Sequence, residues 1–205
     1  MSRTRSLVTV ICTCAMVVAL TGATPALAAD EKQRFTRDEV TVVPPAVTLI
    51  DQNGDTVDFK AALSSDRPVF VDFIFATCTT ICPVLSAGYS SIQRKLGDDR
   101  ERVHLISITI DPEHDGPEEL TGYLERYRAQ SGWDFLTGTR ADIDAVMRAF
   151  DAFVPDKMSH QPLIFIRSPK DDTWVRLYGF ARSSDLMAEL ERAAGGAQSG
   201  EEVAR

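Results

Sequence analysis

Residues 68–75 are nearly all apolar, and Asp72 is the one charged interruption among them. A run of this kind is typical of a β-strand that is covered on both faces, because neither face has to meet water. Residues 83–96 follow with apolar side chains at helical spacing, and Gly97 supplies a stop signal. A buried strand that leads through a short turn into a helix predicts an α/β domain with a central sheet.

The rest of the chain alternates between strand and helix patterns. Residues 47–59 have the pattern of a β-hairpin around an Asn-Gly turn, and residues 103–110 form a second buried run. The spacing also predicts helices that begin at 115 and cover 143–150 and 186–192, a short extended piece at 133–136, and strands at 162–166 and 173–178. This order predicts a central mixed sheet flanked by helices, with an N-terminal β-hairpin.

The first 29 residues have the pattern of a secretory signal peptide. Arg3 and Arg5 form a basic start, residues 7–20 form an apolar run, and Ala26-Leu27-Ala28 offers a cleavage site of small residues. The apolar run is shorter than the roughly 20 residues that cross a bilayer, so cleavage is favoured over an uncleaved membrane anchor. We therefore expect an exported, periplasmic, soluble protein. Its expected segments are a cleavable signal peptide at 1–29, a flexible leader at 30–46, the α/β domain at 47–193 and a disordered tail at 194–205.

Composition narrows the classes of protein further. Acidic residues outnumber basic ones, 30 against 22, for a formal charge of −8. This balance argues against a nucleic-acid partner, because nothing in the sequence builds a basic face. Removal of the signal would take away two arginines and two cysteines, leaving a net charge of −10 and only Cys78 and Cys82. An exported chain with one close pair of cysteines points to a redox pair or to a site for a soft metal.

Cys78 and Cys82 lie where the buried strand ends and the next helix begins, and Pro83 follows directly. Unpaired amides and the positive end of the helix dipole favour a thiolate over a thiol at this position, which lowers the pKa of a cysteine. Pro83 suits the first helical turn because it has no amide proton to lose. The pair can therefore form a disulfide or share one metal ion.

The other residue types indicate which metal such a pair would hold. A structural zinc site needs four ligands, and the sequence has no second Cys or His pair at metal spacing. Two thiolates and one imidazole instead make a three-coordinate soft site, which suits Cu(I) better. The imidazole could come from His104, His114 or His160, and each of these also has an ordinary structural interpretation. Spacing alone does not choose among them.

Several motifs together resemble the Sco/SenC family over about residues 47–190. The matching motifs are the segment 73–75 leading into Cys78-x-x-x-Cys82-Pro83, the strand and DPxxDxP loop at 107–117, and the segments 135–138 and 179–180. The resemblance implies a thioredoxin-like fold. It also implies a copper site formed by Cys78, Cys82 and His160, which would take Cu(I) and also Cu(II).

Two more residues become candidates through this resemblance. Asp111, in the DPxxDxP loop, would support the site or help to recognise a partner, and capping of its own loop is an equally good interpretation. Met158 could offer a thioether near copper, although packing is its default role. The chain also departs from the family at two positions: Thr79 stands where a Pro is common, and Ser159 stands where an acidic residue is frequent. These departures leave the copper affinity and the reduction potential open.

The resemblance implies a copper metallochaperone tied to assembly of the CuA centre of cytochrome c oxidase. Its partner would be the copper-receiving subunit of a respiratory oxidase or another exported copper enzyme, and the chain itself is expected to be a monomer. The alternative is a thiol–disulfide oxidoreductase, in which Cys78 and Cys82 reduce the cysteines of the recipient copper site. A copper or redox sensor is a third interpretation. Only the reductase among these would be an enzyme.

Overall fold

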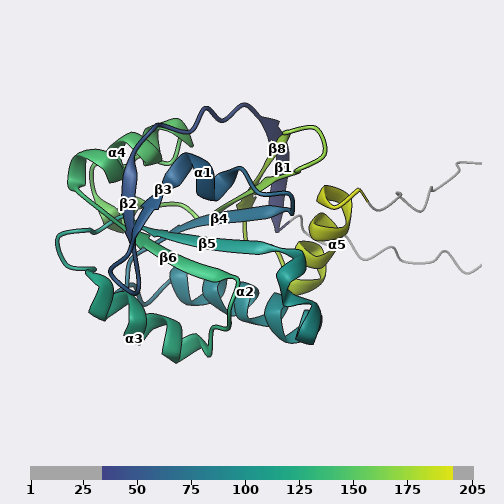
Figure 1. Cartoon of the computed structure of the whole chain (residues 1–205), viewed down its shortest axis with the longest axis horizontal. Helices are drawn as coiled ribbons and strands as arrows, with labels where there is room; N and C mark the ends of the chain where they lie inside the picture. The colour runs from purple at the N-terminus through teal and green to yellow at the C-terminus, as the bar shows by residue number, and fades with distance from the viewer. Residues whose placement is uncertain (1–33, 196–205) are drawn as a thin grey trace, which may run out of the picture. The chain divides into compact units, whose positions relative to one another are not determined.

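The computed structural model describes residues 34–195, and within them an eight-stranded mixed sheet lies between helices (Figure 1). The strands are β1 (Phe35–Val40), β2 (Thr48–Asp51), β3 (Thr56–Asp58), β4 (Val69–Ile74), β5 (His104–Thr109), β6 (Trp133–Thr137), β7 (Leu163–Arg167) and β8 (Trp174–Gly179). The α-helices are α1 (Phe59–Leu63), α2 (Cys82–Leu96), α3 (Pro117–Tyr127), α4 (Arg140–Ala149) and α5 (Ser183–Ala193), and the short 3-10 segments are η1 (Gly97–Arg102) and η2 (Lys157–Ser159). The order across the sheet is β1-β8-β7-β4-β5-β6-β2-β3.

Strand β4 occupies the interior of this sheet, parallel to β5 and antiparallel to β7. Every residue of Val69–Ile74 is buried, and the side chains alternate between the two faces. Phe70 packs against Tyr89 of α2, with ring centroids 6.4 Å apart. Phe73 packs against Phe150, which follows α4, at 5.6 Å. The covered strand and the mixed sheet flanked by helices are therefore confirmed.

The predicted N-terminal hairpin is confirmed as β2 and β3, which pair antiparallel with Thr48 opposite Asp58. The Asp51 carboxylate organises its turn by accepting hydrogen bonds from the backbone N–H groups of Asn53, at 2.8 Å, and Asp55, at 2.9 Å. Gly54 has a φ of +86°, a left-handed conformation that glycine adopts without a steric cost. The hairpin joins the sheet through β6.

The sequence predicts a flexible leader at residues 30–46, whereas residues 35–40 form strand β1 and pair along β8. The inner four residues of β1 are exposed and include Arg37, Asp38 and Glu39, so they lack the apolar alternation by which a strand is recognised. Charged side chains are usual on an edge strand, because they discourage pairing with other chains. The pattern that suggested a leader therefore belongs to the outer strand of the sheet.

Two of the element boundaries that differ from the prediction have a clear local cause. Phe59 begins α1 instead of ending the hairpin, because the Asp58 carboxylate accepts a hydrogen bond from the Ala61 N–H and caps a helix there. The helix expected to start at residue 115 begins at Pro117, and its capping contact runs from the Gly116 N–H to the Glu119 carboxylate. Asp115 is thereby left free for a different role near the cysteines.

The predicted signal peptide at 1–29 and residues 196–205 of the predicted tail lie outside the described residues. Of the tail, Ala194 and Gly195 are described, and they close the end of α5 by donating backbone hydrogen bonds to the carbonyls of Leu190 and Arg192. Between residues 34 and 195, no helix combines the length and the apolar character that a membrane span requires.

Candidate metal centre

The cysteine pair lies at the junction of two elements of regular structure. Phe75, just after β4, accepts a hydrogen bond at its carbonyl from the Cys78 N–H at 3.1 Å, which closes a tight turn. Cys82 is the first residue of α2, and Pro83 occupies its first turn. Both cysteines are free thiols, with exposed fractions of 6% for Cys78 and 0% for Cys82. The fold therefore positions both sulfurs at one end of the buried strand.

His160 reaches this junction from the segment between η2 and β7. Its Nε2 lies 3.4 Å from the Cys82 Sγ, and its Nδ1 lies 2.8 Å from the Lys157 carbonyl oxygen. Because a carbonyl only accepts, Nδ1 carries the proton, and Nε2 of the neutral ring keeps its lone pair toward the cysteines. Burial lowers the pKa of His160, which favours this neutral form. The imidazole is thus prepared to act as a ligand.

The ligand atoms of Cys78, Cys82 and His160 all lie within 4.8 Å of one another. Two thiol sulfurs and one imidazole nitrogen at these separations can converge on a single soft ion. Of the three histidines, His160 is therefore the one that the fold brings to the cysteines. His104 instead contacts the Asp134 carboxylate at 2.7 Å, and His114 contacts Asp111 at 3.0 Å with a largely exposed ring.

The two cysteines differ in electrostatic environment. Burial acts to raise the pKa of Cys78, but hydrogen bonds from Cys82 and Thr80 outweigh it and lower that pKa overall. Burial and the hydrogen bond with Cys78 raise the pKa of Cys82. Cys78 is consequently the easier of the two to deprotonate, and it is also the more exposed.

The loop at residues 111–115 contacts both sides of the site. Asp115 accepts hydrogen bonds from the Ala76 N–H at 2.9 Å and from the Thr109 hydroxyl at 2.6 Å, so it holds the start of the cysteine turn. Asp111 forms an ion pair with Lys157, whose carbonyl holds the His160 ring. Burial opposes ionisation of Asp111, but Lys157 and His114 outweigh it and lower its pKa.

The remaining predicted site residue, Met158, has an exposed fraction of 67%, so its side chain lies mostly in solvent. Lys157 is a supporting residue that the sequence did not indicate, because a lysine 46 positions from its aspartate carries no local signal. Thr79 is exposed, and Thr80 places its hydroxyl 3.6 Å from the Cys78 Sγ.

Asp72, the charged interruption in β4, is fully buried beneath the cysteine side of the site. Within residues 34–195, neither of its carboxyl oxygens has a hydrogen-bond partner of normal geometry. Burial raises the pKa of Asp72 to about 7, and Ser107, opposite it on β5, counteracts the rise only in part. A negative charge on Asp72 would also act against a thiolate at Cys82.

Comparisons with known proteins point to one family. The family model described as SCO1/SenC matches residues 36–194 of the chain. The SCO1 protein homolog of Bacillus subtilis is 35% identical over 130 residues, which cover 60% of this chain and 66% of that protein. Protein sco1 of Schizosaccharomyces pombe is 29% identical over 161 residues, which cover 70% of this chain and 57% of that protein. The chain thus spans between about half and two thirds of the length of these relatives.

Solved structures share the fold. ScoI of Bradyrhizobium japonicum, solved with copper bound, has a TM-score of 0.61 and 26% identity, covering 74% of this chain and 99% of that one. BsSco, a member of the Sco family of cytochrome c oxidase assembly proteins for which a disulfide switch was identified, has a TM-score of 0.64 and 26% identity. That match covers 78% of this chain and 98% of BsSco. The predicted thioredoxin-like fold is confirmed.

Proposed function

This chain belongs to the SCO1/SenC family, and on that premise we propose that it binds Cu(I) through Cys78, Cys82 and His160 and passes it to the copper site of a partner protein. The observation that carries the proposal is the convergence of two thiol sulfurs and one imidazole nitrogen within 4.8 Å. The family to which BsSco belongs assembles cytochrome c oxidase, and ScoI has been solved with copper bound.

The donor set favours Cu(I) over zinc. Thiolates are soft ligands that select Cu(I), and a three-coordinate arrangement is unusual for zinc, which prefers a tetrahedral site. The hydrogen bond from Nδ1 to the Lys157 carbonyl fixes the orientation of the ring in the way that metal-binding histidines require. No residue of the site has to change its protonation except the cysteines, which lose protons when the ion binds.

The site also suits transfer of the ion to another protein. It lies at the end of a sheet strand and the start of a helix, where Thr79, Val84 and Met158 are exposed beside the ligands in sequence. A partner could approach from this side and replace one ligand at a time. The recipient that we propose is the copper-receiving subunit of a respiratory oxidase or of another exported copper enzyme.

Export to the periplasm is part of the proposal and rests on the signal-peptide pattern of residues 1–29. A reducing cytosol would be less suited to a protein whose two remaining cysteines have to alternate between states. We also propose that the protein acts as a monomer. The acidic balance of the chain favours a recipient with a basic docking face.

Cu(I) binding can be tested by competition with a chromophoric chelator. The wild-type chain should bind one Cu(I), and Cys78→Ser should weaken binding by about a hundredfold or more, because a thiolate ligand is lost. Thr79→Ser is the matched control, since it changes the neighbouring exposed residue and should leave the affinity within about twofold. A Cys78→Ser protein that binds Cu(I) as tightly as the wild type would contradict the proposal.

The second candidate function is reduction of a disulfide at the recipient site. The lower pKa and greater exposure of Cys78 fit an attacking thiolate, and the buried Cys82 fits a resolving thiol. The Cys78 thiolate would attack one sulfur of the partner's disulfide, forming a mixed disulfide and releasing one partner thiolate. Cys82 would then lose its proton and attack the Cys78 sulfur, releasing the second partner thiol. Two electrons pass to the partner, and this chain is left as the disulfide.

Replacement of His160 by alanine separates the two functions. A reductase needs only the cysteines, so His160→Ala should keep its activity on a peptide disulfide. A copper carrier holds the ion partly through the imidazole, so the same variant should load less Cu(I) and deliver less of it to the recipient. If a folded His160→Ala protein lost copper transfer and disulfide reduction to the same degree, the two functions would share a step that needs the imidazole.

A further inference from the structure

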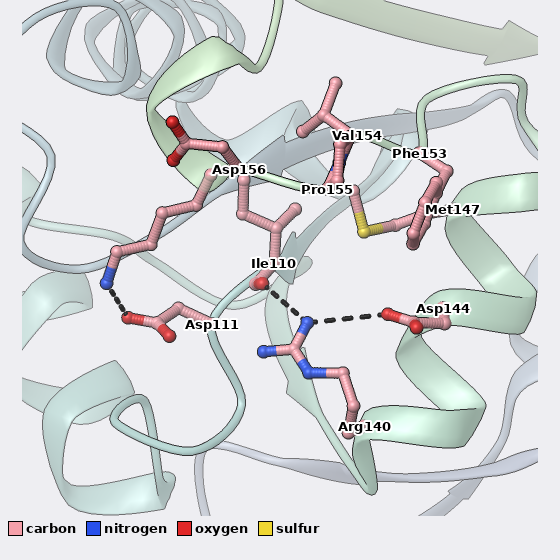
Figure 2. A pocket seen from close by; sticks show the side chains of 10 residues that line it. Ile110, Asp111, Arg140, Asp144, Met147, Phe153, Val154, Pro155 and Asp156 are labelled. Atoms are coloured by element: carbon pink, nitrogen blue, oxygen red, sulfur yellow. Dashed lines mark hydrogen bonds and ion pairs between the residues drawn. The ribbon is translucent and has the colours of Figure 1, made fainter.

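A cavity of about 490 Å³ lies beside the metal centre and is not used by the proposed metal chemistry. It is bounded by the loop after β5, by α4 and by residues 153–157 that lead into η2. Figure 2 shows Met147, Phe153 and Val154 on one side of this space, with Arg140 and Asp144 on the other. We call this cavity the side pocket.

The side pocket combines an apolar wall with a charged one. Met147 is almost fully buried, and Phe153 and Val154 are partly buried, so together they offer a surface for an aliphatic chain. Three carboxylates and two cations line the pocket, and both cations are already paired. Arg140 pairs with Glu113 and donates to the Ile110 carbonyl at 3.1 Å, and Lys157 pairs with Asp111.

Of the two carboxylates of this pocket that have no close ion pair in the described part of the chain, Asp144 and Asp156, Asp144 lies on α4 one turn before Met147 of the apolar wall. Among the residues that the structure describes, its one ion-pair partner is Arg140, at a long 3.5 Å. A carboxylate can accept several hydrogen bonds, so Asp144 could receive a further cationic group. A carboxylate above an apolar wall matches the side chain of lysine or arginine, which has an aliphatic stem and a charged head. The volume of the pocket is sufficient for such a side chain with its flanking backbone.

The side pocket is linked to the metal centre by a short series of contacts. Asp111 lines the pocket and pairs with Lys157, as Figure 2 shows for the Asp111 carboxylate. The Lys157 carbonyl accepts the Nδ1 proton of His160, whose Nε2 faces the Cys82 sulfur at 3.4 Å. A cation that entered the pocket would compete with Lys157 for Asp111 and so loosen the segment that carries His160.

We propose that the side pocket receives a lysine or arginine side chain of the copper-receiving protein, and that its occupation releases His160 from the metal. This inference rests on the proposed copper-transfer function and adds how docking triggers release. Charge complementarity carries the choice of occupant, because carboxylates outnumber cations in the pocket and acidic residues outnumber basic ones in the chain.

The test measures the rate at which Cu(I) passes from the loaded protein to a chromophoric chelator. The probe is a blocked Ala-Lys-Ala peptide, and a blocked Ala-Gln-Ala peptide is its uncharged match. The lysine peptide should accelerate transfer about fivefold or more, with saturation, and the glutamine peptide should not. Asp144→Asn should abolish the acceleration while leaving Cu(I) affinity without peptide unchanged, because Asp144 contacts none of the proposed ligands.

Asp98→Asn is the matched control, since it removes one exposed carboxylate on η1 and should keep the full acceleration. Equal acceleration in wild type and in Asp144→Asn, or no acceleration of the wild type, would overturn the inference. Failure of the proposed function is a separate result, because it would appear as a lack of Cu(I) binding before any peptide is added. A saturable effect that requires Asp144 supports the inference.

Discussion

The two sides of the candidate metal centre are held in different ways. The cysteine side is fixed by β4 and α2, by the backbone bond between Cys78 and Phe75, and by the buried Asp115. The histidine side is a single 3-10 turn, held by the ion pair of the partly exposed Lys157 with Asp111 and by the edge-to-face packing of the His160 ring on Phe75, with centroids 5.3 Å apart. The cysteines are thus part of the core, and His160 is attached to it.

For the proposed copper carrier, this difference suggests the order in which the ligands leave the ion. Contacts within regular elements open rarely, whereas a short turn held by a few polar contacts opens at a lower free energy. We therefore expect the imidazole to leave the ion before either thiolate does. Substitutions on the cysteine side should then weaken Cu(I) binding more than substitutions on the histidine side.

The largest difference should appear in Cu(I) affinity. Cys82→Ala removes a thiolate held by the core and should weaken Cu(I) binding by about a thousandfold, which corresponds to about 4 kcal/mol. His160→Ala should weaken it by only about ten- to thirtyfold, because two thiolates can still hold a soft ion. Competition with a chelator measures both variants, and circular dichroism checks that they fold. Equal losses in the two variants would remove the distinction between the two sides.

Asp72, which is buried beneath the cysteine side, should make the free energy of unfolding depend on pH. The pKa of Asp72 is about 7 in the folded chain against 3.8 ordinarily, so between these values the folded protein keeps a proton that the unfolded chain has lost. The free energy of unfolding consequently falls as the pH rises through this range. Asp72→Asn cannot ionise, so its stability relative to the wild type should increase by about 3 kcal/mol between pH 5 and pH 8.

Urea denaturation of both proteins at the two pH values measures this change. Only the pH dependence of the difference matters, so a constant cost of burying the asparagine amide does not affect the result. Asp98→Asn, which replaces an exposed carboxylate on η1, is the matched control for the substitution itself. A flat profile for Asp72→Asn would mean that Asp72 is ionised in the folded protein already at pH 5.

The sequence was most informative where local pattern and structure coincide. The covered strand β4, the cysteine pair and α2 follow one another within 30 residues, so their apolar spacing predicts the cysteine side directly. His160 lies 78 residues from Cys82, and nothing local distinguishes it from His104 or His114. Only the family resemblance selected it. Strand β1 was missed because its charged residues reflect an edge position, which no local pattern reveals.

A smaller effect should separate the two aspartates of the 111–115 loop. Asp115→Ala leaves the Ala76 N–H and the Thr109 hydroxyl without their acceptor in the interior, which should lower the free energy of unfolding by about 2 kcal/mol. Asp111→Ala frees Lys157, which can reach solvent, and should cost about 1 kcal/mol or less. Urea denaturation of the apo-proteins compares the two variants. A larger loss for Asp111→Ala would mean that the histidine side contributes more to the fold than its exposure indicates.

The smallest effect concerns Met158, which tests whether the histidine side contributes a second ligand. Its thioether is a soft donor two positions before His160, but the exposed fraction of 67% places most of the side chain in solvent. Met158→Leu keeps the apolar volume and removes the sulfur, so Cu(I) affinity should stay within about twofold of the wild type. Chelator competition measures this, with His160→Ala as the reference for a lost ligand. A loss comparable to that of His160→Ala would show that the turn rearranges when the ion binds and delivers the thioether as well as the imidazole. The histidine side would then change its conformation on metal binding more than its contacts in this structure suggest.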